Sequence, residues 1–177
     1  MKKLRYSLAA IVIATVAFIA VPTHAQETEM TDDHIAHIKS NCPTALSTLA
    51  RIHANDAPVY INHNQTYFSI SDKLMAKLNS RLTLNRYDAT GLVKTASNYN
   101  VQLTKFRTAY KDYDDTMADL LRMDCRLQPV SFYDKVADAR AKRQKVNDIV
   151  TQMKALIDQY DQEVTTFKTT RLSGDNT

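Results

Sequence analysis

The sequence predicts an all-α protein: an elongated, antiparallel coiled-coil bundle of three to four long helices. The 177 residues include only two Gly and four Pro, too few for the regularly spaced turns of a β-sandwich or barrel. Gly91 and Gly174 stand alone and cannot form the glycine-rich loop of a nucleotide-binding α/β fold. Large apolar residues also recur at alternating steps of four and three, which is the heptad pattern of packed helices.

The first 25 residues have the features of a secretory signal peptide. A charged start is followed by an uncharged apolar run at residues 8–21, and Ala25 precedes the expected cleavage site. The run is shorter than the roughly 20 residues of a membrane span, so we expect cleavage and export to the periplasm, the cell surface or the medium. The alternative is an uncleaved segment that anchors the protein in the membrane through residues 6–22.

Most of the excess positive charge lies in this signal peptide. The full chain has 23 Lys and Arg against 19 Asp and Glu. Residues 1–25 hold three of these cations and no acids, so residues 26–177 have 20 basic and 19 acidic residues. A domain that binds duplex nucleic acid usually has a clear basic excess. We therefore expect no nucleic-acid partner.

Two cysteines, Cys42 and Cys125, remain after cleavage. An oxidising compartment favours a disulfide between them, and a bridge over so long a loop would stabilise the fold by about 4–5 kcal/mol in the chain-entropy model. The alternative is a pair of free or buried thiols. The absence of a CxxC or CxxCH pattern gives no reason to expect a zinc ion, a haem or another cofactor.

The first helical stretch is expected to begin after Thr31, a predicted N-cap followed by two acidic residues. Pro43 lies inside its apolar stripe, so the helix is expected either to kink or to restart there. The polar residues 55–64 predict a break. A helical stripe then resumes in the order Tyr67, Ile70, Leu74, Leu78 and Leu82.

Two longer heptad seams occupy the second half of the chain. The first runs from Leu92 to Leu120, and the second runs from Phe132 to Phe167 with Arg143 as its only polar member. The helices that carry these two seams are each expected to span roughly 50–60 Å at about 1.5 Å per residue. We expect one helical coiled-coil domain over residues 26–172 and a disordered tail at 173–177.

The short connections at residues 86–90 and 126–130 predict antiparallel neighbours. Folding the chain about residue 128 brings four aspartates level with a basic run, so we expect opposite charges to face each other. The two groups are Asp112, Asp114, Asp115 and Asp119, and Arg140, Lys142, Arg143 and Lys145.

The same reasoning places other side chains. Arg143 is expected to stack on Tyr113 or to pair with Asp114, and folding about residue 88 brings Lys105 level with Asp72. On that register Cys42 lies 46 positions before the turn and Cys125 lies 37 after it, a mismatch of nine. A disulfide therefore needs slack, which the predicted break could supply.

Aromatic residues in the seams are the main candidates for an interaction surface, because a Tyr hydroxyl prefers an edge where it reaches water or a partner. The alternative is that they fill a wide seam between helices. These residues are Tyr99, Phe106, Tyr110, Tyr113, Phe132, Tyr160 and Phe167.

His34 and His37 share a helix face and are weak candidates for metal ligands, since no further ligands complete a site. His53 and His63 flank the predicted break and are expected in a loop. The sequence has no arrangement of Ser, His and acidic residues that predicts catalysis, so we expect a protein without enzymatic activity.

Residues 124–150, DCRLQPVSFYDKVADARAKRQKVNDIV, resemble a group of uncharacterised exported helical proteins from reduced-genome bacteria. The shared features are a Cys followed by Gln-Pro, an aromatic-Tyr-Asp helix start and an Ala-Arg repeat. In plan the chain also resembles periplasmic helical chaperones of the Skp type. The resemblance implies export and long helices, and it brings no functional residue.

Together these observations predict an exported coiled-coil interaction protein, acting as a scaffold, an adhesive spacer or a chaperone. Its partner would be another protein or a second copy, and it would meet a membrane only if the signal peptide stays uncleaved. The alternative is a helical bundle that binds a small ligand or a metal between its helices.

Overall fold

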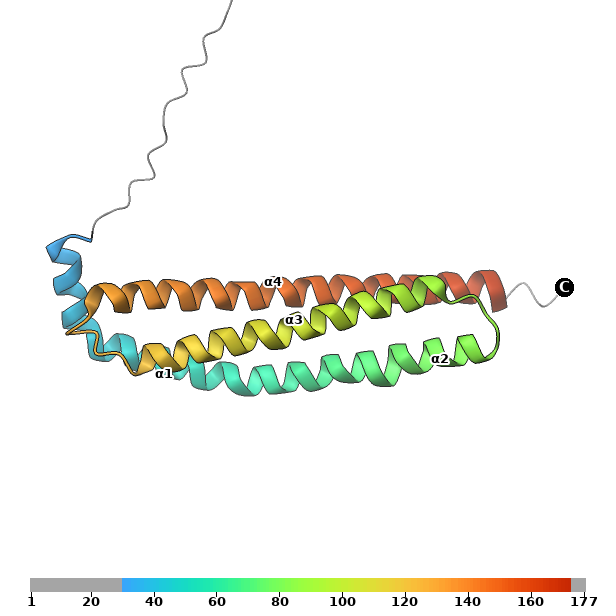
Figure 1. The fold of residues 1–177 in the computed structure, drawn as a ribbon, viewed down its shortest axis with the longest axis horizontal. Helices are drawn as coiled ribbons and strands as arrows, with labels where there is room; N and C mark the ends of the chain where they lie inside the picture. The colour runs from blue at the N-terminus through green and yellow to red at the C-terminus, as the bar shows by residue number, and fades with distance from the viewer. Residues whose placement is uncertain (1–29, 173–177) are drawn as a thin grey trace, which may run out of the picture.

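The computed structural model describes residues 30–172, and this part of the chain is all-α, as the sequence predicts. Figure 1 shows an elongated molecule in which helical rods lie side by side. The predicted signal peptide and the predicted tail at 173–177 lie outside the described residues. The elements are α1 (Asp32–Ser69), the π-helix η1 (Ile70–Ala76), α2 (Lys77–Leu84), α3 (Thr90–Leu121), α4 (Pro129–Phe167) and the π-helix η2 (Lys168–Leu172).

α1 begins at the predicted cap, where the side chain of Thr31 accepts a hydrogen bond from the backbone N–H of His34. The helix does not restart at Pro43, because it continues through both Pro43 and Pro58. Its first turns, blue in Figure 1, lie across the end of the molecule at an angle to the later turns. A proline inside a helix lacks one backbone hydrogen bond and clashes with the preceding turn, which bends the helix.

The predicted break at residues 55–64 is wrong, since α1 is helical throughout this stretch. Three polar or aromatic residues, one turn apart, each contact α3. Asp56 accepts a hydrogen bond from Tyr113, Tyr60 stacks on Tyr110, and Asn64 accepts one from Arg107. The face of α1 that packs against α3 therefore continues through this stretch, but polar and aromatic side chains form it in place of aliphatic ones.

α3 lies between the other two rods and carries the centre of the core. All nine residues of its predicted heptad seam are buried: Leu92, Ala96, Tyr99, Leu103, Phe106, Tyr110, Tyr113, Met117 and Leu120. In the α4 seam, Phe132, Ala139, Met153 and Tyr160 are buried, and most of the other members are half-buried. The seams are therefore the faces on which the helices pack.

α3 and α4 pair about residue 128, as predicted. Lys135 lies 3.4 Å from Asp119, and Thr95 donates a hydrogen bond of 2.8 Å to Glu163. The predicted charge ladder is wrong in its partners, however. Lys135–Asp119 is the only ion pair between α3 and α4 within residues 30–172. Asp114 and Asp115 instead pair with His53 and Lys111.

The register between the first rod and α3 differs from the prediction. Asn64 contacts Arg107, and Asn79 contacts the backbone of Leu92. The chain therefore folds back about a point between residues 85 and 86, and not about residue 88. Lys105 and Asp72 form no ion pair in the described part of the chain. Because this point lies earlier in the chain than predicted, Cys42 and Cys125 lie at more similar distances from the turn, and most of the predicted mismatch of nine residues disappears.

Cys42 and Cys125 accordingly form a disulfide without a break in α1. Their Cα atoms lie 5.7 Å apart, and both residues are buried. Cys125 follows the end of α3, and Cys42 lies on the angled part of α1. The disulfide thus fastens the beginning of α1 to the connection between α3 and α4.

The turn after α2 closes with two backbone hydrogen bonds, from Arg86 to Thr83 and from Tyr87 to Leu82. This is the Schellman pattern, whose penultimate position adopts the left-handed conformation and is usually Gly. Here it is Arg86, with φ of 62°. The turn therefore carries backbone strain that a glycine would relieve.

Two buried tyrosines contact the backbone around η1. The hydroxyl of Tyr99 donates to the carbonyl of Tyr67. The hydroxyl of Tyr160 donates to Asn79 Oδ1 at 2.7 Å, and the carbonyl oxygen of Met75 lies 3.3 Å from the same hydroxyl. A π-helical turn alters the direction and pairing of backbone carbonyls. The tyrosines of α3 and α4 supply hydrogen bonds at this irregular segment.

Candidate functional site

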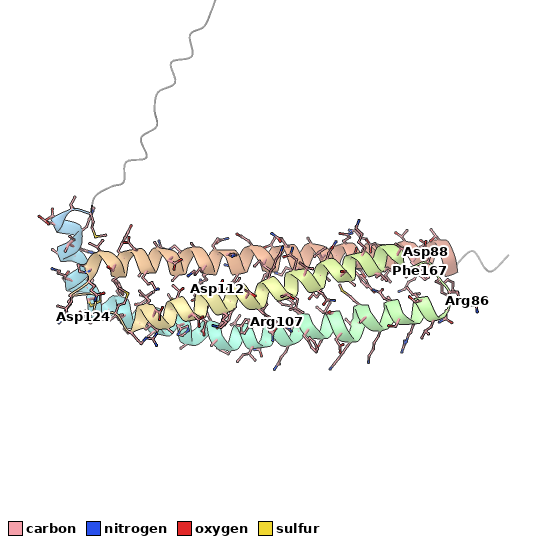
Figure 2. All side chains as sticks on the ribbon, viewed as in Figure 1. Arg86, Asp88, Arg107, Asp112, Asp124 and Phe167 are labelled. Atoms are coloured by element: carbon pink, nitrogen blue, oxygen red, sulfur yellow. A yellow bond between two sulfur atoms is a disulfide. The ribbon has the colours of Figure 1, made fainter. Side chains whose placement is uncertain are left out.

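A groove runs over the angled part of α1 and the beginning of α4, at the end of the molecule marked by Asp124 in Figure 2. It consists of three adjoining hollows, of which the largest has a volume of about 470 Å³. Ile38 and Tyr133 belong to two of them, and Thr44 and Thr48 connect the third. We call this feature the end groove.

The floor of the end groove is apolar because α1 crosses α4 here at an angle. The side chains that form the floor are Ile38, Ala45, Leu49, Ile52, Phe132, Tyr133 and Val136. Several of them pack around the Cys42–Cys125 disulfide. The disulfide therefore holds the two walls of the groove together.

The rim of the end groove carries basic and neutral polar residues. Arg140 lines the central hollow, Arg51 lies at one side, and His34 and His37 line the other end. None of the described residues that line the groove is Asp or Glu. A partner would thus meet an apolar floor with positive charge beside it.

The two histidines, the weak metal candidates of the sequence, are exposed and share the hollow with Met30. Within residues 30–172, no group of three or more His, Cys, Asp or Glu is placed to hold a metal ion. The prediction that His53 lies in a loop is wrong. His53 lies on α1, where its Nε2 is 2.7 Å from Asp114 Oδ1. His63 also lies on α1.

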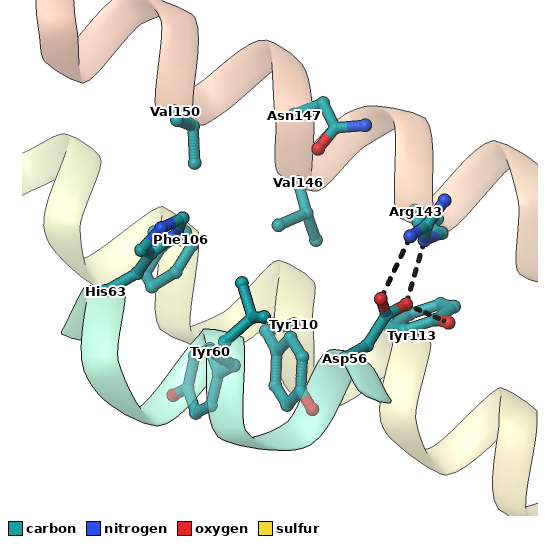
Figure 3. Close-up of a pocket in the computed structure, with 11 residues that line it drawn as sticks. Asp56, Tyr60, His63, Phe106, Tyr110, Tyr113, Arg143, Val146, Asn147 and Val150 are labelled. Carbon is teal, nitrogen blue, oxygen red and sulfur yellow. Dashed lines mark hydrogen bonds and ion pairs between the residues drawn. The ribbon is translucent and has the colours of Figure 1, made fainter. Parts of the chain in front are cut away.

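A second polar site lies in the middle of the molecule, where one carboxylate connects three helices (Figure 3). Asp56 of α1 accepts two hydrogen bonds from Arg143 of α4, at 2.8 and 2.9 Å, and one of 2.7 Å from the Tyr113 hydroxyl of α3. Arg143 thus pairs with Asp56 and not with Asp114. Burial alone would raise the pKa of Asp56, but the bonds from Arg143 and Tyr113 lower it below its usual value.

Beside this site is a small cleft of about 140 Å³. Tyr60 and Tyr110 stack along it with ring centroids 3.6 Å apart, and Val146 and Val150 face them from α4 (Figure 3). Pockets for organic ligands and cofactors usually measure roughly 300–1,000 Å³. The cleft and the Asp56 site therefore fit a structural role better than a ligand-binding role.

The predicted aromatic interaction seam is packed inside the chain itself. Six members are buried, namely Tyr99, Phe106, Tyr110, Tyr113, Phe132 and Tyr160, and Phe167 is half-buried against Tyr87. The rods of the same chain occupy the space that a partner helix would take. Binding through these residues stays a prediction that requires the core to open.

The end groove and the Asp56 site were both missed from the sequence. For Asp56 a signal existed, because His53, Asp56, Tyr60 and Tyr67 keep the heptad spacing across the predicted break. The groove depends on the angle between the first turns of α1 and its later turns, and an apolar pattern does not specify that angle.

None of the helices in residues 30–172 has an apolar stretch long enough to cross a membrane. The comparison with known proteins finds no family model, no curated protein and no solved structure that matches this chain.

Proposed function

We propose that this chain is an exported, antiparallel coiled-coil protein of three helical rods that binds a protein partner through the end groove. It would act as a scaffold, an adhesive spacer or a chaperone, without catalytic activity. The observation that carries this proposal is the apolar hollow of about 470 Å³ between α1 and α4. Open apolar grooves of this kind accept the apolar face of a partner helix.

Exposed side chains extend the apolar surface beyond the groove. Tyr133 is 56% exposed, and Leu127 and Val130, on the same connection and first turn of α4, are 79% and 44% exposed. Contiguous exposed apolar surface on a soluble protein often marks an interaction site. Leu127 and Val130 precede Phe132 in the sequence, so they add exposed apolar area at the same end of the molecule.

Export is supported by the signal-like residues 1–25 and by the buried disulfide. Disulfides persist in secreted and periplasmic proteins and are rare in the cytosol, where thiols are kept reduced. A bridge between Cys42 and Cys125 that shapes the groove fits a protein that works outside the cytosol.

The test is site-specific photo-crosslinking in cells that produce the full chain. A photoreactive residue at Tyr133 should give one discrete protein adduct, whereas the same residue at Val101, exposed on α3, should not. Thr48→Trp fills the groove from its exposed edge and should suppress the adduct. Equal adducts from both positions, or an adduct unaffected by Thr48→Trp, would contradict the proposal.

A second assay addresses the chaperone role. The purified exported protein should slow the aggregation of a chemically unfolded client, and Thr48→Trp should reduce this effect. If the groove variant protects the client as well as the parent protein does, chaperone action through the end groove is excluded, and the scaffold and spacer roles remain.

A further inference from the structure

We infer that the segment recognised by the end groove is an amphipathic helix whose apolar face is flanked by carboxylates. This inference rests on the proposed function and names the chemistry of the partner. It is carried by the shape of the apolar floor and by the uncompensated positive charge beside it.

The floor has the dimensions of a helix-binding groove. Its α1 wall extends from Ile38 to Ile52, which is about 21 Å of helix at 1.5 Å per residue. A partner helix of about four turns would match this length and place apolar residues at steps of three and four against the floor. The Phe132 and Val136 wall of α4 lies opposite.

The positive charge comes from two arginines at the same level of the molecule. The Asp56–Arg143 pair sets the register between α1 and α4, and it places Arg51 level with residue 138, within one turn of Arg140. Neither Arg51 nor Arg140 has an ion-pair partner among residues 30–172. Both are exposed, Arg140 on the groove itself and Arg51 on the adjoining hollow.

Three other cations on this part of α4 are already compensated. Lys135 pairs with Asp119, Lys142 with Asp138, and Arg143 with Asp56. No described Asp or Glu lines the groove, although residues 26–177 are nearly neutral as a whole. The charge that remains at the groove therefore favours a partner with carboxylates beside its apolar face and disfavours a basic one.

The test uses two synthetic helical peptides with the same leucine face, one flanked by Glu and the other by Lys. Each is labelled with a fluorophore and titrated with the oxidised, purified exported protein, and binding is followed by anisotropy. The Glu-flanked peptide should bind at least tenfold more tightly at low salt. The difference should shrink at high salt, because exposed charges are screened.

Charge-reversal variants identify the responsible residues. Arg51→Glu with Arg140→Glu should reverse the preference, so that the Lys-flanked peptide binds more tightly. The matched control, Lys94→Glu with Lys154→Glu, makes the same change of net charge at exposed positions away from the groove and should keep the original preference. Thr48→Trp should weaken both peptides.

Equal affinity of the two peptides for the parent protein would overturn the inference, and so would a reversal by the control variant. If neither peptide binds while the Tyr133 adduct persists, the inference fails and the proposed function stands. If light scattering shows a dimer that Arg140→Glu converts to a monomer, the groove binds a second copy, and the inference is wrong.

Discussion

Arg143 donates hydrogen bonds of 2.8 and 2.9 Å to the two carboxylate oxygens of Asp56, which lies 87 residues earlier in the chain. The hydroxyl of Tyr113 donates to the same carboxylate, so the contact joins α1, α3 and α4. A bidentate Arg–carboxylate pair has a fixed geometry. It therefore fixes the axial register of α1 against α4 at a point where the apolar seam is interrupted.

Removing this contact should destabilise the fold moderately. Arg143→Met should lower the free energy of unfolding by about 1–2 kcal/mol, since charged hydrogen bonds contribute roughly 1.5–3 kcal/mol and partial exposure weakens the pair. Urea unfolding of Arg143→Met, Asp56→Asn and the double variant gives the coupling energy. Lys145→Met, at an exposed position on the same helix, is the control and should change little. Additive effects would show that the pair contributes nothing.

Alkaline pH should unfold the protein through its buried tyrosines. Burial, with a smaller effect of Asp114, raises the pKa of Tyr110 to about 12. In the unfolded chain the Tyr110 hydroxyl has its ordinary pKa near 10. The contribution of the protonated Tyr110 hydroxyl to the free energy of unfolding is therefore fully present below pH 10 and is lost as the pH rises towards 12. Tyr110→Phe should resemble the parent at pH 7 and lose about 1.4 kcal/mol less stability by pH 11. Parallel curves of unfolding free energy against pH for the two proteins would refute this assignment.

The strained turn offers a stabilising substitution. Arg86→Gly should raise the free energy of unfolding by about 0.5–1 kcal/mol, because Gly adopts a positive φ without the steric cost of a side chain. Arg81→Gly, in the last turns of α2, should instead lower it by about 1 kcal/mol. Thermal melts followed by circular dichroism measure both changes. A lower melting temperature for Arg86→Gly would mean that the arginine side chain stabilises the turn.

The disulfide should contribute strongly to stability and react slowly. Cys42→Ser with Cys125→Ser should cost up to about 4–5 kcal/mol in the chain-entropy model. Cys42 is 5% exposed and Cys125 is 0% exposed, so a thiol reductant should react only after local opening. Mass spectrometry should show reduction that accelerates in mild urea. Immediate reduction in buffer would contradict this protected position.

The sequence predicts α3, α4 and their pairing well because apolar seams and a short connection specify all three. Leu92 to Leu120 is buried at every seam position, and the hairpin folds about the expected residue. Here local preference and tertiary packing agree, so the hydrophobic period alone is sufficient.

The first rod is predicted less well because its inward face changes chemistry. Between His53 and Tyr67 the stripe is formed by aromatic and ionisable residues, which a hydrophobic pattern assigns to solvent. Pro58 strengthens the expectation of a loop, yet the contacts of Asp56 and Tyr60 outweigh the lost backbone bond. The end groove results from the bend in α1. The direction of that bend depends on tertiary packing, which the hydrophobic pattern of the sequence does not specify.

The disulfide also determines how the molecule would carry a mechanical load. Cys42 and Cys125 close a covalent ring that contains the rest of α1, η1, α2 and α3, whereas α4 lies outside it. A pull between Met30 and the end of α4 passes through the sulfur bridge and bypasses the 83-residue loop. Under tension α4 would peel away while the ring keeps its length. Reduction would then release up to about 300 Å of additional chain.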